Sequence, residues 1–403
     1  MILVPLPLVA FRLNEPLPYS LYNANGHLLL SQGTVIESAE QRQQLMNRGC
    51  FVDRMQLALH QRAFAEKLGG MLRRNASIKE LAEVKPDESV RPPPPPSAPA
   101  DPISIWQGLE IQMAQLLGPD LSEGWLERFH KLVSDLFLMN ERDPDGFLFL
   151  SIQSLKESVH RYALVHSLQV ALVCDLVARQ RPDWSENVRQ SLVSAALTMN
   201  ISIISLQNQM ALQATPPRPE QRISLQQHPA QSVAILRSYG VNDHLWLNAV
   251  ALHHNSPPGP LSVRPLDEQL ARIIQRVDVF AARMSPRLHR RSLSATAAAQ
   301  AIYTDEQKNP DEAGAAILKA VGLYPPGCFV RLKNDEVAVV IKRGQMANEP
   351  MVVSIVGHDG MPLGTPVVRD TRSNVYATSG GVPAHEVKVL INPLKMLKMR
   401  SFL

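Results

Sequence analysis

The pattern of apolar and polar positions divides the chain into short strands, a long helical region and a second group of strands. Near the amino terminus, Asn25-Gly26 separates the apolar runs Leu21-Tyr22 and Leu28–Leu30, an arrangement typical of a two-residue β-hairpin. We therefore predict a small α/β module over residues 1–83, which begins with a buried strand in the apolar segment 1–11.

Apolar residues recur at helical spacing from residue 103 to residue 322, and proline or glycine falls at the joints. The segments 160–179 and 187–205 are apolar on nearly every face, so we expect them at the centre of a helical domain. Thr198 and Asn200 interrupt the longest apolar run, which favours a core helix over a membrane span. The predicted helices cover Ile103–Leu117, Glu123–Met139, His160–Arg179, Asn187–Ser205, Pro229–Tyr239, Asp243–His254, Asp267–Ala282, Ser294–Tyr303 and Asp311–Val321.

Five consecutive prolines, Pro92–Pro96, mark the clearest boundary, because such a run is extended and does not join a packed core. We place a proline-rich linker over residues 84–102, the helical domain over 103–325 and a β-rich tail over 326–403. The expected fold class is therefore α+β and multidomain. Within the tail, strands are predicted at Phe329–Leu332, Val337–Ile341, Met351–Val356 and Val387–Ile391.

Composition narrows the function classes only slightly. The net charge of +4 over 403 residues is too weak to argue for nucleic-acid binding. The three cysteines are far apart in the sequence and form no metal-binding spacing, which fits a reducing compartment. The apolar amino terminus has neither a basic segment nor a cleavage site. We expect a cytoplasmic protein without a membrane span and without a nucleic-acid partner.

Histidines in the helical domain carry the candidate chemistry. His166 lies early in an apolar helix, His228 is expected to open a helix as His-Pro, and the pair His253-His254 ends another. Asp278 follows on an apolar helix, where a carboxylate is costly to bury unless it is paired or metal-bound. Taken singly, each residue can equally be a hydrogen-bonded core side chain. Together, imidazoles and a carboxylate from several helices predict a metal site inside a bundle.

The order of these residues resembles an HD-GYP domain, a branch of the HD phosphohydrolases that hydrolyses cyclic di-GMP with two or three metal ions. The resemblance covers residues 103–395 and implies a helical HD-type domain. It also implies manganese or iron as the metal, and contacts from Arg287 and Arg290 to the phosphates of the dinucleotide. The matching segments are His166–Ala171, His228-Pro229, His253-His254, Val277–Ala282, Tyr324–Leu332 and Glu336–Val340.

The departures from the family pattern fall on the metal ligands. Met199 and Asn200 stand where the family has its defining His-Asp pair, and Tyr162 stands where some members have a ligating glutamate. The loop after His254 is shortened and lacks the family's tyrosine. A two-metal mechanism needs the bridging aspartate to hold both ions close to one activated water, and Asn200 is a poor bridge. Met199 is too soft a donor for manganese or iron.

We therefore expect a degenerate HD-GYP protein of bacterial cyclic di-GMP signalling, which binds the nucleotide or another signalling protein with little or no hydrolysis. Two alternatives stay open. The chain is a residual metal-dependent phosphodiesterase that forms pGpG or GMP, or it is a pure protein-interaction scaffold. No cofactor is expected, or at most one divalent ion, manganese or iron. The residues that can hold it are His166, His228, His253, His254 and Asp278.

Overall fold

The computed structural model describes residues 101–117, 124–157, 159–288 and 290–400, together with short stretches between residues 3 and 53. The chain divides into two compact units, residues 1–99 and 100–403. The predicted linker, residues 84–102, lies almost wholly outside the described residues, as do residues 54–83. The three predicted boundaries between these segments therefore stay predictions. The described residues combine helices with antiparallel sheets, which agrees with a mixed α and β fold.

The amino-terminal unit contains a four-stranded antiparallel sheet in the order β1-β4-β2-β3. The pairing of β2 with β3 confirms the predicted hairpin, although its turn lies outside the described residues. Its strands are β1 Leu3–Pro5, β2 Leu21–Tyr22, β3 Leu28–Leu30 and β4 Phe51–Asp53. Its core contains Leu17, Tyr19, Leu21, Ile36, Cys50 and Val52.

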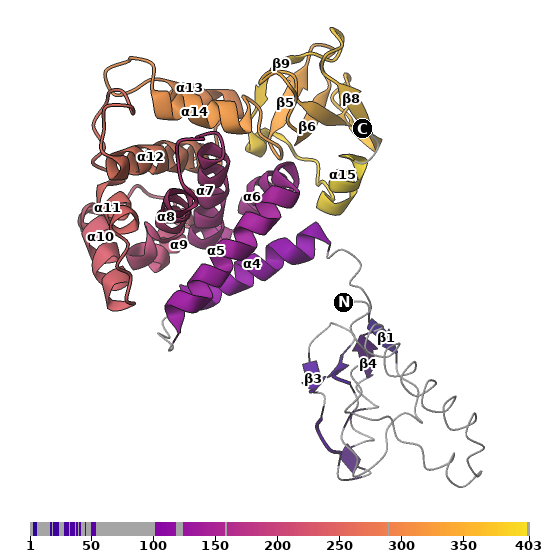
Figure 1. Ribbon diagram of the computed structural model, residues 1–403. Coiled ribbons are helices and arrows are strands. Elements are labelled where there is room, and N and C mark those ends of the chain that lie inside the picture. Colours follow the sequence, from indigo (N-terminus) through magenta and orange to yellow (C-terminus); the bar gives the residue numbers. More distant parts are fainter. Residues whose placement is uncertain are drawn as a thin grey trace, which may run out of the picture. The chain divides into compact units, whose positions relative to one another are not determined.

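The second unit is built around helix α7, Tyr162–Ala178, which is buried along its whole length (Figure 1). The helical segment 159–178 is long and apolar enough to cross a membrane. However, 94% of the apolar 18-residue stretch within it is buried inside the protein, as for a core helix. Helices pack around α7 because no face of it is polar. Those that pack against it are α4 Pro102–Leu116, α5 Trp125–Arg142, α6 Pro144–Glu157, α8 Glu186–Thr198, α9 Ile204–Ala211, α12 Leu266–Met284 and α14 Glu312–Val321. The helices α10 Pro219–Ser238, α11 His244–Leu252 and α13 Ala295–Tyr303 pack mainly on other elements of this outer layer.

Two of the helix predictions are wrong in ways that matter for the site. The segment predicted as one helix over 187–205 breaks after Thr198 and continues as a short 3-10 turn, Ile201–Ile203, before α9. His228 does not open a helix either. Helix α10 begins at Pro219, which occupies its first turn, so the His228-Pro229 pair lies in its interior. Helix α6 was not predicted.

The tail forms a five-stranded antiparallel sheet in the order β8-β7-β6-β5-β9, beside α13 and α15 (Pro393–Met399) in Figure 1. Three predicted strands are confirmed as β5 Phe329–Leu332, β6 Val337–Lys342 and β7 Met351–Val356. The predicted strand Val387–Ile391 is wrong, because that segment is not assigned to a strand. The remaining strands are β8 Pro362–Asp370 and β9 Thr378–Val382.

Ion pairs fix the tail to the start of α6. Arg343 donates from Nε to Asp145 Oδ1 at 2.5 Å, and Arg400 donates from Nη1 to Asp143 Oδ1 at 2.6 Å. Both arginines come from the tail and both carboxylates from the first residues of α6 or the residue before it. The helices and the tail are consequently joined at the amino-terminal end of α6.

Gly327 lies where the backbone of the tail approaches α6 closely. Its φ of +97° lies in the left-handed region, and a Cβ atom there would be 2.9 Å from the carbonyl oxygen of Phe149. The Gly327 carbonyl accepts a hydrogen bond from Gln153 Nε2 at 2.5 Å. The tail therefore packs against α6 through a backbone contact that tolerates no side chain.

Replacing Gly327 by alanine should lower the free energy of unfolding by about 1–3 kcal/mol, because it combines backbone strain with overpacking. Chemical denaturation of the full chain measures this change. Gly364→Ala is the matched control, since nothing lies within 4 Å of a Cβ at Gly364. Equal stability of the two variants would show that the tail does not depend on this contact.

Candidate metal centre

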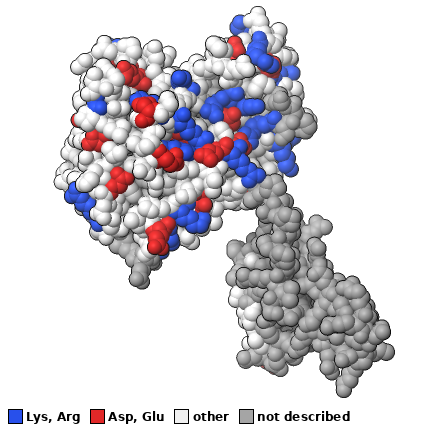
Figure 2. Space-filling view, viewed as in Figure 1, with Lys and Arg blue, Asp and Glu red and all other residues white. Residues whose placement is uncertain are grey.

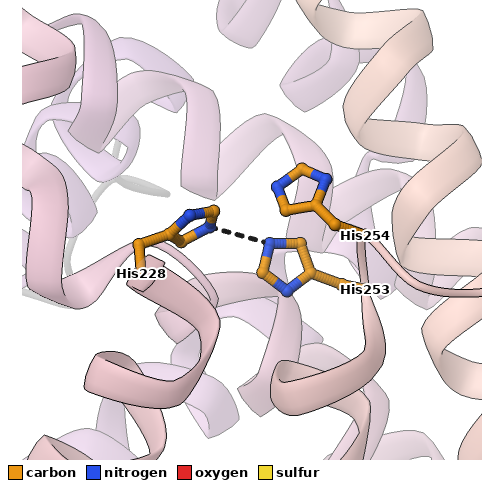
Figure 3. A group of neighbouring side chains, drawn as sticks. All are labelled: His228, His253 and His254. Carbon is orange, nitrogen blue, oxygen red and sulfur yellow. Dashed lines mark hydrogen bonds between the residues drawn. The ribbon is translucent and has the colours of Figure 1, made fainter. Parts of the chain in front are cut away.

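Three histidines from two neighbouring helices meet at one point (Figure 3). His228 projects from α10, and His253 and His254 directly follow the last residue of α11. One ring nitrogen from each of the three lies within 4.8 Å of the others, so this group can hold a metal ion. Asp243 caps the start of α11 by accepting the backbone N–H of Trp246 at 3.1 Å, which fixes where the helix begins.

The proline after His228 sets the orientation of that ring. Within a helix, the carbonyl of residue 225 would accept the N–H of residue 229, but Pro229 has none. The Leu225 carbonyl is thus left without its helical donor, and it lies 2.7 Å from Nδ1 of His228. Because a carbonyl only accepts, Nδ1 carries the hydrogen, and Nε2 is left with its lone pair directed into the site.

His253 has the same arrangement for a different reason. Its Nδ1 lies 2.7 Å from the carbonyl of Val250, one of the last four carbonyls of α11. Such carbonyls have no partner within the helix, so they are available to a side chain. Nδ1 of His253 therefore also carries the hydrogen, and its Nε2 is an unprotonated donor to any cation.

The two unprotonated nitrogens face each other. Nε2 of His228 lies 3.1 Å from Nε2 of His253, and both side chains are buried. Burial lowers the pKa of His253 to about 3, helped by the charge of His254, and burial also lowers the pKa of His228. When both rings are neutral with their hydrogens on Nδ1, no hydrogen lies between the two Nε2 atoms, and a bound cation would relieve the repulsion of their lone pairs.

His254 completes the group from the solvent side. Its ring centroid lies 4.1 Å from that of His253 and 5.0 Å from that of His228, and it is exposed. Three protein ligands with one side open leave room for water or an anion on a bound ion. This is the arrangement of reactive rather than purely structural metal sites.

His166 and Asp278 form a separate pair. His166 Nε2 lies 2.7 Å from Asp278 Oδ1, and the side chains are 1% and 21% exposed. Since a carboxylate only accepts, this Nε2 carries the hydrogen, in contrast to the other two histidines. Burial would raise the pKa of Asp278, but the hydrogen bond and charge of His166 outweigh it and hold the pKa well below its usual range.

Tyr162 and Arg287 close the other side of His166. The Tyr162 ring stacks on His166, and its hydroxyl lies 3.5 Å from His166 Nδ1. Arg287 Nη2 donates to that hydroxyl at 2.5 Å, and the guanidinium lies 4.5 Å from the ring centre. Arg290 is exposed and donates to the backbone carbonyl of Ala282. The two arginines predicted to contact phosphate therefore differ in their surroundings. Arg287 is hydrogen-bonded to a side chain within the protein, whereas Arg290 is exposed to solvent.

The two substituted positions are buried. Met199 is completely inaccessible and belongs to the main hydrophobic core, and Asn200 is 4% exposed. They occupy the break between α8 and the 3-10 turn. The side chain of Met199 thus serves packing in the core.

Sequence reasoning missed the ion cluster that holds the turn after His254. Arg272 donates to the Ser256 carbonyl at 2.9 Å, and Arg272 and Arg276 both pair with the buried Asp311. The signal was present, because Arg272 and Arg276 lie four residues apart on the otherwise apolar face of a predicted helix. Such arginines need a buried partner, and Asp311 precedes the next predicted helix.

The donor set does not fit a carboxylate-bridged metal pair of the kind that the resemblance implies. The three-histidine group contains no carboxylate among the described residues. His166 engages the carboxylate of Asp278, and the position of the bridging aspartate is Asn200. Among the described residues, the structure brings together one group of three histidine nitrogen donors and one hydrogen-bonded His-Asp pair.

No protein-family model matches the chain, and no curated protein matches it. A search of solved structures found a chain described as a HDG"Y"P protein from Bdellovibrio bacteriovorus. The match has a TM-score of 0.40 and 13% sequence identity, and it covers 79% of this chain and 99% of that chain. What the present protein can do is therefore inferred from its own side chains.

Replacing Pro229 by alanine restores a backbone N–H that competes with His228 for the Leu225 carbonyl. We expect the free energy of unfolding to rise by about 1 kcal/mol or more, because proline is unfavourable inside a helix. Divalent-metal affinity should fall about tenfold, as when the hydrogen-bond partner of a metal-binding histidine is lost. Denaturation and competition with a chelating dye measure the two effects.

Pro219→Ala is the matched control for that variant, because the N–H of a first-turn residue has no helical partner in any case. It should change neither quantity appreciably. A more stable P229A protein with unaltered metal affinity would contradict the role assigned to the proline.

Proposed function

We propose that the protein is a degenerate HD-GYP protein of cyclic di-GMP signalling, which acts by binding with little or no hydrolysis. The observation that carries the proposal is the division of the predicted site into two parts. His228, His253 and His254 form an open group, whereas His166 and Asp278 are paired with each other. No carboxylate belongs to the open group of histidines among the described residues, so nothing in it bridges two ions. Hydrolysis by the two-metal route needs such a bridge.

Basic side chains beside the closed pair support nucleotide binding. Arg287 lies against the Tyr162 ring that stacks on His166, and the charge of Asp278 acts on Arg290. Arg290 is exposed and can turn toward a ligand, and a guanidinium can bind a phosphodiester through two parallel hydrogen bonds. Arg287 would contact phosphate only if a ligand displaces its bond to the Tyr162 hydroxyl.

The mixture of acidic and basic side chains on one face of the second unit favours a small ligand over a nucleic acid in this proposal. On the face seen in Figure 2, acidic and basic side chains of the second unit are interspersed, without a continuous basic surface. A cyclic dinucleotide needs only a local pair of cations, whereas a nucleic-acid backbone needs an extended basic track. We accordingly propose a small cytoplasmic ligand, or a protein partner that competes for the same arginines.

The hydrolytic alternative rests on the open three-histidine group, which leaves a coordination position for water. It predicts turnover of cyclic di-GMP to pGpG or GMP when metal is added. The binding proposal predicts a complex without product, so product analysis after metal addition separates the two functions.

Titration calorimetry of cyclic di-GMP into the full chain should detect binding, and chromatography should find no pGpG or GMP with manganese or iron added. Arg290→Glu should weaken binding about tenfold or more, which corresponds to about 1.4 kcal/mol for one phosphate contact. Arg237→Glu, which reverses an exposed arginine near the end of α10, is the control and should bind normally. Absence of binding to the unaltered protein would refute nucleotide recognition and favour the scaffold alternative.

A further inference from the structure

We infer that His228, His253 and His254 form a mononuclear site for one divalent ion of the zinc class, in place of a carboxylate-bridged manganese or iron pair. The inference concerns the site of the proposed function and rests on its proposed ancestry, but it does not depend on nucleotide binding. It names the kind and number of ions that these residues select.

The spacing between the nitrogens of His228 and His253 fits two ligands of one ion, and a nitrogen of His254 lies within 4.8 Å of both. Imidazole nitrogens bind zinc at about 2.0–2.1 Å, so two ligands of the same ion are roughly 2.9–3.4 Å apart, depending on the coordination geometry. Nε2 of His228 and Nε2 of His253 are 3.1 Å apart. Their Nδ1 atoms are held by the Leu225 and Val250 carbonyls, so both lone pairs already point into the same space.

The donor type selects among metals. Three neutral imidazoles and no carboxylate favour zinc, copper, nickel and cobalt over manganese and magnesium, which prefer oxygen donors. The side chains of His228 and His253 are buried and fixed in position, which also favours a small ion with few ligands. The chemistry of the group therefore differs from that of the manganese or iron pair implied by the resemblance.

Among the described residues, a second ion has no comparable group of ligands. His166 presents an N–H, not a lone pair, to Asp278, and its other face is covered by Tyr162. The guanidinium of Arg287 lies against the same tyrosine and adds a positive charge that repels a cation. One ion per chain is the expected stoichiometry.

An ion held by three neutral ligands keeps its full charge of +2. The exposed side of the group, at His254, is then an electropositive position open to water or to an anionic oxygen. A phosphate or carboxylate group is the chemical class that would occupy it. Asp278 is hydrogen-bonded to His166 and is not one of the ligands, although its negative charge acts on His228, His253 and His254 and would offset part of the ion's charge.

The test uses the full chain after removal of metal by a chelator. Cobalt titration followed by visible absorption should saturate at one ion per chain, and competition with a zinc dye should show zinc binding about 100-fold or more tighter than manganese. His254→Gln should weaken zinc binding about 100-fold, whereas His244→Gln, an exposed histidine at the start of α11, should leave it unchanged.

His166→Gln distinguishes the two kinds of site. It should leave zinc affinity within about twofold if the ion belongs to the three-histidine group alone, and circular dichroism checks that each variant is folded. Two ions per chain, equal affinity for manganese, loss of zinc in His166→Gln, or no binding at all would each overturn the inference. Cyclic di-GMP titrated into metal-free and zinc-loaded protein reports separately on the proposed function, since nucleotide can bind whether or not zinc does.

Discussion

The absence of one backbone N–H, at Pro229, governs the chemistry of this protein more than any single side chain. It frees the Leu225 carbonyl, and that carbonyl takes the Nδ1 hydrogen of His228. The end of α11 frees the Val250 carbonyl in the same way for His253. The Nε2 lone pairs of two neutral imidazoles thereby face each other, with the two Nε2 atoms 3.1 Å apart and both rings buried. The carbonyls left without a helical donor thus orient two imidazoles so that they favour a cation, without any acidic ligand.

The other part of the predicted site, His166 and Asp278, differs because the Nε2 atom of this histidine carries a hydrogen. His166 gives its Nε2 hydrogen to Asp278 and is covered by Tyr162, which in turn holds Arg287. The His166 Nε2 hydrogen and the Arg287 Nη2 hydrogen both have acceptors within the protein, while Nε of Arg287 is buried without a hydrogen-bond partner. The histidines predicted as ligands therefore serve two purposes: three form a group of nitrogen donors, and His166 belongs to a hydrogen-bonded network with Asp278. The distinction depends on where each hydrogen lies, not on which residues are present.

Much of the fold could be predicted from the sequence, because the central helices have unambiguous patterns. The prediction of residues 160–179 corresponds closely to α7, which has no polar face. Strand β8 was missed because Pro362, Gly364 and Pro366 obscure its alternation, as is common at a sheet edge. Val387–Ile391 has strand-like composition but is not assigned to a strand. Composition alone does not show which segments find a neighbouring strand.

The site was predictable to the level of residue type and no further. The histidines and Asp278 stand out in the sequence, but His228 was assigned to a helix start, and in a first turn its neighbouring proline would free no carbonyl. The free carbonyl exists only because α10 begins nine residues before His228. Likewise, the pairing of His166 with Asp278 joins residues 112 positions apart and follows from the packing of α12 on α7.

Anomalous diffraction at the zinc edge, from crystals of the zinc-soaked full chain, tests the central claim most directly. The account predicts one peak, bounded by His228, His253 and His254, with the His166–Asp278 hydrogen bond unchanged beside it. A second peak between His166 and Asp278, or a single peak ligated by Asp278, would contradict it.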